Sequence, residues 1–297
     1  MNLEVCEYAI LISCYNRVGN IANLIESSIL NSTAHIYIHQ DGLSAQDNYA
    51  KYLQVEKLIQ EYQSIYTNRI SYMQQKQNLG CYLGVVTGIN WAFKNHDFLL
   101  ILEDDLDIED SSFSYVENNL QYLNADKYAC LSLYREPTPN YIQDVQLQES
   151  IFFSSWGWVT SREKWDLFES DMKYLKFLKM ISRIWWQYGY QLAFKFHYVR
   201  KRMQQGDIDS WAYRWQFSLI ASNQLTLYPK ISFATNLGFG EVSTHTKRPP
   251  KLLAKLQPSN PKVMSRYLKS TESNKQFDWG ILQTRYSLTT NKRLPRC

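Results

Sequence analysis

The sequence predicts an α/β protein with a single Rossmann-like domain, in which helices cover both faces of a mostly parallel central sheet. The N-terminal half alternates short apolar, strand-like runs with segments of helical periodicity. Three of the strand-like runs end in polar or acidic residues, as strands do at the ligand-binding edge of open α/β sheets. The composition, with 45% hydrophobic and 15% aromatic residues, is that of a globular chain and excludes a disordered one.

Strands and helices alternate regularly over the first hundred residues. In chain order we predict a strand over Tyr8–Cys14, a helix through Ile21, Leu24, Ile25 and Ile29, a strand over His35–Gln40, a helix within 44–63, a strand over Arg69–Met73, a helix through Val85, Val86, Ile89 and Phe93, and a strand over Phe98–Leu102. Asp41-Gly42 and Asn78-Leu79-Gly80 are turn signals between them. This β-α-β order predicts parallel strands joined by right-handed crossovers.

The strand Phe98–Leu102 is followed by a dense group of acids. Its five apolar residues are typical of a strand that is buried on both faces. Glu103, Asp104, Asp105, Asp107, Glu109 and Asp110 come next, and carboxylates this close repel one another unless a cation neutralises them. Oxygen ligands favour Mg²⁺ or Mn²⁺, with phosphate oxygens of a substrate completing the coordination. A solvated acidic loop is the alternative interpretation.

The second half is less regular. We predict a strand over Ile151–Ser155 that runs into Trp156-Gly157-Trp158, a helix capped by Ser161, an aromatic helix from Trp211 to about Ser222, and a strand over Leu225–Phe233. A glycine- and hydroxyl-rich loop follows over 236–246. After Pro249-Pro250 the chain is polar and basic, and we expect a loosely packed C-terminal tail.

Charge, hydropathy and cysteine usage favour a cytoplasmic protein. The net charge of +4 is too small to indicate nucleic-acid binding by itself. The N-terminus lacks the basic region of a signal peptide, and no apolar run is long enough to span a membrane. The five cysteines are odd in number and lack C-x-x-C spacing, which is typical of reduced thiols.

In the order of its motifs, the chain resembles the GT-A-fold glycosyltransferases that use nucleotide sugars and a D-x-D-type metal motif. It is most similar to the family of the N-acetylglucosaminyltransferase that initiates complex N-glycans and to small bacterial transferases that build surface polysaccharides such as capsule or lipopolysaccharide. The segments that carry the resemblance are 11–17, 39–42, 102–107, 156–158, 209–211 and 236–245. It covers about Tyr8 to Thr246, and the basic residue that the family often has near Tyr82 is absent.

The resemblance implies a GT-A domain over 1–246, with a nucleotide-binding half over about 1–125 and an acceptor half over about 126–246, and an extension over 247–297. It implies a metal-dependent transfer of sugar from a nucleotide sugar, with UDP favoured, to a glycan or lipid-linked acceptor. It assigns the metal to Asp105. The donor is assigned to Tyr15, Asn16, Arg17, Asp41, Asn78, Gly80, Glu103, Asp104, Ser243, Thr244 and His245, and the acceptor to Trp156, Gly157, Trp158 and Trp211.

The transfer also needs a general base to deprotonate the acceptor hydroxyl, and a single base without a nucleophile implies inversion. We choose Asp209, with Asp207 and Glu241 as alternatives. Each of these residues also has a structural interpretation. Asp209 could be a helix N-cap, Asp41 a turn residue and Arg17 a surface residue. His245 could have a structural role, and Trp156 and Trp158 could pack in the core.

One segment, 171–202, combines basic and aromatic residues. Lys173, Lys176, Lys179 and Arg183 recur at helical spacing, with Lys195, Arg200, Lys201 and Arg202 beyond them. The segment is either an ordinary amphipathic helix with a solvated basic face or an interfacial helix for anionic lipid, which would make the protein peripheral at the inner face of the membrane. Two other functions stay open: a sugar nucleotidyltransferase and a non-catalytic nucleotide-sugar or glycan-binding module. Nucleic-acid binding is not expected.

Overall fold

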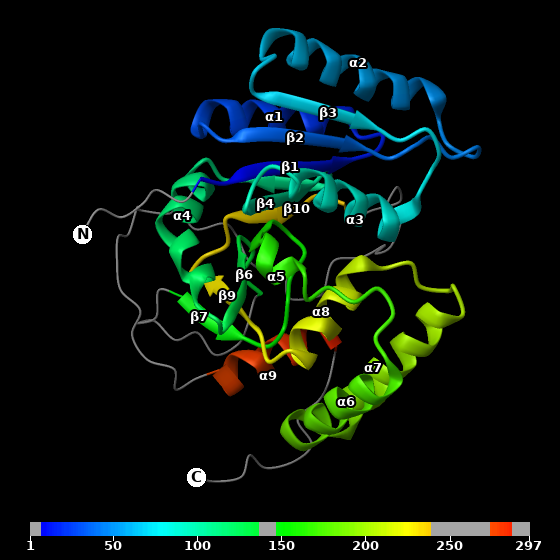
Figure 1. Cartoon of the computed structure of the whole chain (residues 1–297), viewed down its shortest axis with the longest axis vertical. Coiled ribbons are helices and arrows are strands. Elements are labelled where there is room, and N and C mark those ends of the chain that lie inside the picture. The colour runs from blue at the N-terminus through cyan, green and yellow to red at the C-terminus, as the bar shows by residue number, and fades with distance from the viewer. Residues whose placement is uncertain (1–6, 137–146, 239–273, 287–297) are drawn as a thin grey trace.

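The computed structural model describes residues 7–136, 147–238 and 274–286. Its centre is an eight-stranded sheet in the order β3-β2-β1-β4-β8-β6-β9-β7, with helices around it (Figure 1). The first half of the chain comprises β1 (Ala9–Cys14), α1 (Val18–Asn31), β2 (His35–Gln40), α2 (Tyr49–Ile65), β3 (Ile70–Gln74), α3 (Gly80–Ala92) and β4 (Phe98–Glu103). The predicted alternation of strands and helices in this half is confirmed, with bounds that differ by a few residues.

Strands β1 to β4 form the parallel part of the sheet. β1 pairs in parallel with β2 on one side and with β4 on the other, and β2 pairs in parallel with β3. The carboxyl ends of these strands therefore lie at one edge of the sheet, as the sequence predicts. Ser13 is in register with Glu103 and His39 with Met73, so the segments that follow the four strands start close together.

The second half completes the sheet with mixed strand directions. It comprises β5 (Leu106–Ile108), α4 (Ser111–Asn119), a 3₁₀ turn (Leu120–Asn124), β6 (Tyr128–Ser132), β7 (Leu147–Ser150), β8 (Trp158–Ser161), α5 (Arg162–Trp165), α6 (Tyr174–Tyr188), α7 (Tyr190–Gln204), α8 (Trp211–Ala221), β9 (Leu225–Pro229), β10 (Ala234–Asn236) and α9 (Asn274–Tyr286). Only β7 and β8 run against the other strands of the large sheet, so the predicted fold class is confirmed.

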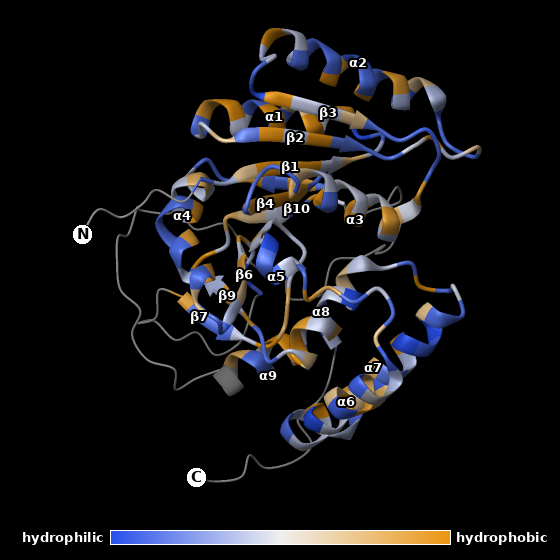
Figure 2. Ribbon diagram, in the orientation of Figure 1, coloured by the Kyte–Doolittle hydropathy of each residue, from blue (hydrophilic) through white to orange (hydrophobic). Residues whose placement is uncertain are grey.

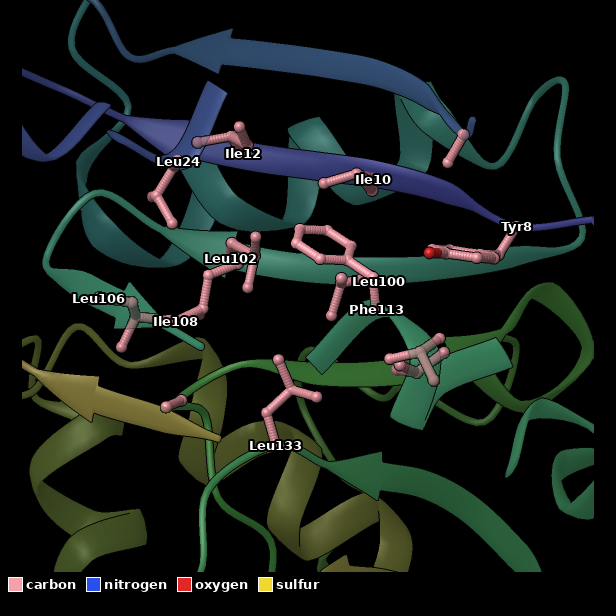
Figure 3. Close-up of a cluster of buried hydrophobic side chains, with 14 of the residues drawn as sticks. Tyr8, Ile10, Ile12, Leu24, Leu100, Leu102, Leu106, Ile108, Phe113 and Leu133 are labelled. Atoms are coloured by element: carbon pink, nitrogen blue, oxygen red, sulfur yellow. The ribbon is translucent and has the colours of Figure 1, made fainter. Parts of the chain in front are cut away.

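The central strands are buried on both faces, because alternate residues enter different cores. Ile10 and Ile12 of β1 pack with α1, α2 and α4 in a cluster that Figure 3 shows in close-up. Ala9 and Leu11 pack on the other face with α3 and α8. Strands β1 and β4 accordingly carry mainly hydrophobic colouring in Figure 2. This two-sided burial explains why these strands have apolar runs instead of alternation.

Two predicted strands differ from the structure. The segment Ile151–Ser155 is not a strand, because its amides bond elsewhere: Phe152 N–H donates to Ser150 Oγ at 2.9 Å and Phe153 N–H to Gln216 Oε1 at 2.7 Å. The neighbouring strand is β7, which ends at Ser150. The predicted strand Leu225–Phe233 stops at Pro229, since proline has no N–H for the ladder, and the chain resumes as β10. Ser161 caps α5 as predicted, accepting from Lys164 N–H at 3.2 Å.

A third hydrophobic core joins α6, α7, α8 and α9 to the edge of the sheet. Helix α9 lies in the region expected to be a loosely packed tail, and for 274–286 that expectation is wrong. Phe277, Ile281 and Leu282 are buried, and the Asp278 carboxylate accepts hydrogen bonds from Ser150 Oγ and, at 2.6 Å, from Tyr188 Oη. Tail residues therefore help to hold the sheet edge and the helices together.

Asp278 should make stability depend on pH. Burial raises its pKa from about 3.8 to about 7, so between these values the folded protein holds a proton that the unfolded chain has released. Its stabilising contribution is therefore largest in acid and is lost as the pH rises through 7, by roughly 2–3 kcal/mol between pH 5 and pH 8. Denaturant unfolding of wild type and Asp278→Asn at both pH values measures this. The Asn variant should lack that part of the pH dependence, and parallel pH profiles would contradict the assignment.

No helix among the described residues is both long and apolar enough to cross a membrane. Cys14, Cys81 and Cys130 have free thiols, and the other two cysteines lie outside the described residues.

Candidate functional site

The acidic strand end is tied to the turn after β1. Asp104 N–H donates to the carbonyl oxygen of Ser13 at 3.0 Å, which continues the β1–β4 pairing past the strand. The Asp104 carboxylate then accepts from Tyr15 N–H at 2.7 Å and from the Arg17 guanidinium at 2.6 Å. Burial raises the pKa of Asp104, and the Arg17 charge and these hydrogen bonds oppose that rise. The two residues thus form a nearly buried ion pair that fixes the edge of the site.

This pairing gives both residues a structural role. The Asp104 side chain is only 7% exposed and both of its oxygens already accept N–H groups, so its contact with the donor stays a prediction. Arg17 is neither a free surface residue nor available as a whole for the nucleotide, since it binds Asp104 and lies 3.9 Å from Asp105. Tyr15 has a similar structural role: its hydroxyl donates to Asp47 at 2.7 Å and accepts from Ser44 N–H at 2.9 Å. Asn16 is half-buried in the same turn.

Glu103 and Asp105 are the acids that remain available. No described residue gives the Glu103 carboxylate a hydrogen bond or an ion pair, and burial, followed by the charges of Asp105 and Asp104, raises the pKa of Glu103 to about 8. Asp105 has only the long contact with Arg17 among the described side chains. Carboxyl groups are therefore crowded at this point without a matching number of cationic side chains, and Glu103 holds its proton at neutral pH.

Asp105 also adjoins the start of the glycine-rich loop. Strands β5 and β10 pair so that Leu106 faces Asn236, and Leu237 N–H donates to the Asp105 carbonyl at 2.7 Å. A Cβ on Gly238 would lie 2.6 Å from Asp105 Oδ2, so the loop passes directly beside the carboxylate. The predicted contacts of Ser243, Thr244, His245 and Glu241 lie outside the described residues.

Asp41 holds two loops of the same edge together. Its carboxylate accepts from the backbone N–H groups of Gly42 and Leu79 at 2.8 Å each and of Gly80 at 3.0 Å. Asn78 Nδ2 donates to the Gly42 carbonyl at 2.7 Å. Burial raises the pKa of Asp41 and the three amides oppose that rise. The turn role that the sequence offered for Asp41 is confirmed, and a contact of Asp41, Asn78 or Gly80 with the donor stays a prediction.

Asp209 reaches the same place from the other half of the chain. Its Oδ2 accepts from Tyr82 N–H at 3.2 Å, in the first turn of α3, and a Cβ on Gly80 would lie 2.8 Å from that oxygen. The N-cap of α8 is Ser210, which accepts from Tyr213 N–H at 3.3 Å, so Asp209 does not cap its own helix. Of the two alternative bases, Asp207 forms an ion pair with Arg202 at 2.9 Å, and Glu241 is outside the described residues.

Cys81 marks the point where the acids converge, and the sequence analysis did not single it out. Burial and, to a smaller extent, the charges of Glu103, Asp209, Asp105 and Asp41 raise the pKa of its thiol to about 12. Asp41 and Asp209 each accept an N–H group from the first turn of α3, and the charges of Glu103 and Asp105 also act on the thiol there. They come from three separate segments of the chain, and no local pattern signals that they meet.

Arg214 is a second residue that the sequence analysis missed. Its guanidinium lies 3.9 Å from the centre of the Tyr82 ring and donates to the Ser210 carbonyl at 2.9 Å. It therefore brings a positive charge to the aromatic position where the resembled family often has a basic residue. An arginine four residues into a helix gives no sign in the sequence of this placement.

The aromatic residues assigned to the acceptor separate into core and surface. Trp158 and Trp211 are buried and stacked on each other, with ring centres 5.4 Å apart, which corrects their assignment to the acceptor. Gly157 has a φ of +73° and passes close to Leu133, so it serves the turn. Trp156 is half-buried, with its ring 4.4 Å from that of Tyr134. It is the one tryptophan of the three that a ligand can reach.

Among the described residues, no group of three or more His, Cys, Asp or Glu side chains could hold a metal ion. Mg²⁺ and Mn²⁺ sites that share the ion with a phosphate use one or two protein carboxylates, and water and phosphate oxygens supply the other ligands. Asp105, with Glu103 beside it, can supply the one or two carboxylates that such an ion takes from the protein. The donor set is all oxygen, as these hard cations prefer.

Comparison with known proteins leaves the family open. No model of a known protein family matches the sequence, and no curated protein is similar to it in sequence. Solved structures with a related arrangement include the crystal structure of S. aureus TarS 1–349, with 11% identity and a TM-score of 0.43 over 77% of this chain and 59% of that one. This chain thus spans about three fifths of the length of that structure.

Proposed function

We propose that this protein is a metal-dependent glycosyltransferase that moves a sugar, with inversion, from a nucleotide sugar to a glycan or lipid-linked acceptor. A UDP-sugar is the favoured donor, and surface polysaccharide synthesis is the favoured setting. The observation that carries the proposal is the convergence of Asp105, Glu103, Asp41 and Asp209 at the carboxyl edge of a parallel sheet. That edge is where open α/β sheets bind nucleotides.

The roles of the acids follow from their surroundings. Asp105 would hold the metal, which supplies a Lewis acid for the growing charge on the leaving diphosphate. Arg17 keeps Asp104 fixed and thereby positions Asp105 next to it. The loop that begins at Leu237 starts against Asp105, so residues of that loop can approach the same phosphate groups.

Asp209 is suited to act as the base. One of its oxygens is held by Tyr82 N–H, and no described residue donates a hydrogen bond to Oδ1. The carboxylate is exposed, so an acceptor hydroxyl can reach the free oxygen and transfer its proton there. An acceptor oxygen activated by this single base would attack opposite the leaving group, so the configuration would invert.

Asp105→Asn should abolish metal-dependent turnover. We would measure hydrolysis of a panel of nucleotide sugars with and without Mn²⁺, expecting wild type to hydrolyse one donor slowly and the variant to lose about 10²-fold or more of that rate. Asp107→Asn is the matched control, because Asp107 is an exposed acid two residues away with the same chemistry. Metal-dependent nucleotide binding without turnover would mean that the acceptor is required. If wild type binds no nucleotide in titration calorimetry, the proposal fails.

A further inference from the structure

Helices α6 and α7 form a hairpin with an unusual charge balance. Residues 172–206 contain eight Lys or Arg residues and no Asp or Glu. The whole chain has a net charge of +4, so the rest of the chain carries −4. In Figure 1 the hairpin lies at the end of the molecule opposite α2. Positive charge is thus concentrated in the hairpin, as it also is in the basic sequence after Pro249-Pro250.

The same hairpin carries most of the exposed large hydrophobic side chains. Seven of the twelve such residues in the described part of the chain lie in its 25 positions from 174 to 198. They are Tyr174, Leu178, Trp185, Trp186, Tyr190, Phe194 and Tyr198, with Trp186 88% exposed. Single exposed apolar residues are common on protein surfaces, but a cluster of this size marks an interaction site.

Six of these side chains form a stripe on each helix. On α6, Tyr174, Leu178 and Trp185 recur at steps of four and seven residues, and the α7 residues Tyr190, Phe194 and Tyr198 recur every four, so each set forms one stripe. Other faces of both helices are buried in the third core. The stripes meet at the bend, where the Trp185 and Tyr190 rings lie 6.4 Å apart.

The contact between the two helices lies beside one end of the α6 stripe. The Arg200 guanidinium lies 5.5 Å from the ring centre of Tyr174 and 4.8 Å from that of Phe177, which is buried. The ring of Phe177 is in turn 6.3 Å from that of His197, one helical turn from Arg200 on α7. Hydrophobic and hydrophilic residues accordingly alternate along both helices in Figure 2.

The structure separates six of the eight basic residues into two groups of three. The other two, Lys195 and Arg200, lie over the rings of Tyr286 and Tyr174. Lys176 pairs with Glu169, Arg183 binds the Ile220 carbonyl and Asn223, and Arg202 pairs with Asp207, so these three serve the fold. The single basic face predicted from the sequence is therefore partly turned toward the protein. Lys173, Lys179 and Lys201 are exposed and have no ion-pair partner among the described residues.

We propose that the exposed stripes of the α6–α7 hairpin dock the protein on an anionic lipid bilayer. Tryptophan and tyrosine rings are amphipathic and settle at the level of the lipid head groups, and lysines beside them are attracted to anionic lipid. The absence of any acid from 172–206 suits such a surface and would be unnecessary for a merely solvated one. The hairpin packs against α8, which begins directly after Asp209 and Ser210, so docking would hold the candidate site at a fixed distance from the bilayer.

Flotation with lipid vesicles tests this without any measurement of activity. Wild type should float with phosphatidylcholine vesicles that contain phosphatidylglycerol at low salt, and less at high salt. Trp186→Ser/Phe194→Ser should weaken binding by about 30-fold or more, since it removes two exposed aromatic anchors. Lys179→Gln/Lys201→Gln should weaken it roughly 30-fold through lost attraction to anionic lipid.

Matched controls exist elsewhere on the surface. Leu30 and Ile65 are 80% and 70% exposed, and Lys51 and Lys94 are exposed lysines away from the hairpin. Leu30→Ser/Ile65→Ser and Lys51→Gln/Lys94→Gln should bind vesicles like wild type. Circular dichroism and thermal unfolding establish that every variant is folded.

Three results would overturn the docking proposal. The first is no flotation of folded wild type with anionic vesicles at low salt, and the second is an equal loss in the control variants. The third is a wild-type dimer in sedimentation velocity without lipid that Trp186→Ser/Phe194→Ser converts to a monomer while vesicles bind neither form. That result would assign the surface to a second copy of the chain.

Discussion

Asp209→Asn is expected to lower the rate of donor turnover by about 10²–10⁴-fold while leaving nucleotide binding nearly unchanged. The variant keeps an oxygen that can accept from Tyr82 N–H, so the first turn of α3 should stay as it is. What it loses is the ability to take a proton from the attacking hydroxyl. The rate of donor hydrolysis or transfer, together with nucleotide affinity from calorimetry, separates these effects.

Asp207→Asn is the matched control for this prediction. Asp207 is also a carboxylate and lies two residues away, but it pairs with Arg202 instead of approaching α3. Its replacement should change turnover little. Loss of turnover in Asp207→Asn with normal turnover in Asp209→Asn would move the base to Asp207. Normal turnover in both, with loss in Glu241→Gln, would move it to the glycine-rich loop.

Arg285→Leu is expected to lower the free energy of unfolding by about 3–5 kcal/mol, the largest effect on stability that we predict. Arg285 Nε donates to Glu136 Oε1 at 2.6 Å, and its guanidinium also binds the Phe153 carbonyl. The Glu136 side chain is only 6% exposed, so without Arg285 its charge would be buried and unpaired. Equilibrium unfolding in urea at neutral pH measures the change.

The double variant Glu136→Gln/Arg285→Leu distinguishes this cause from simple loss of packing. Removing the acid together with its partner leaves no buried charge, so the double variant should be more stable than Arg285→Leu alone. A double variant that is as unstable as the single one would show that packing of the Arg285 side chain dominates. A loss below about 1 kcal/mol in Arg285→Leu would mean that the pair behaves like a surface ion pair.

The first half of the fold was predictable because its signals are local. His35–Gln40 was predicted with the bounds that the structure has, and the helix after Gly80 was placed correctly. Strands buried on both faces give apolar runs, and helices between them give a period of 3.6 residues, so each element is encoded in its own neighbours. Ile151–Ser155 failed because its amides bond to Ser150 and Gln216, and the second of these is 63 residues away.

The site was predictable in its location but only partly in its roles. A strand that ends in acids identifies the edge of the sheet, and the sequence placed Asp105 and Asp41 there. It could not show that Asp104 is neutralised by Arg17, because an arginine 87 residues away leaves no local pattern. Trp158 and Trp211 were equally ambiguous, since an aromatic residue serves a core and a sugar-binding surface alike.

The sequence by itself determined the alternation of strands and helices in the first half, the sheet edge at which the acids gather, and the basic, aromatic character of 171–202. Tertiary structure alone decided that Asp209 lies at the first turn of α3, that Arg285 pairs with the buried Glu136, and that the aromatic residues of α6 and α7 are exposed. The physical reason is the separation along the chain of the residues that interact. Periodicity and strand burial are properties of adjacent residues, whereas these contacts join residues that are far apart in the chain and meet only when the sheet and its helices pack.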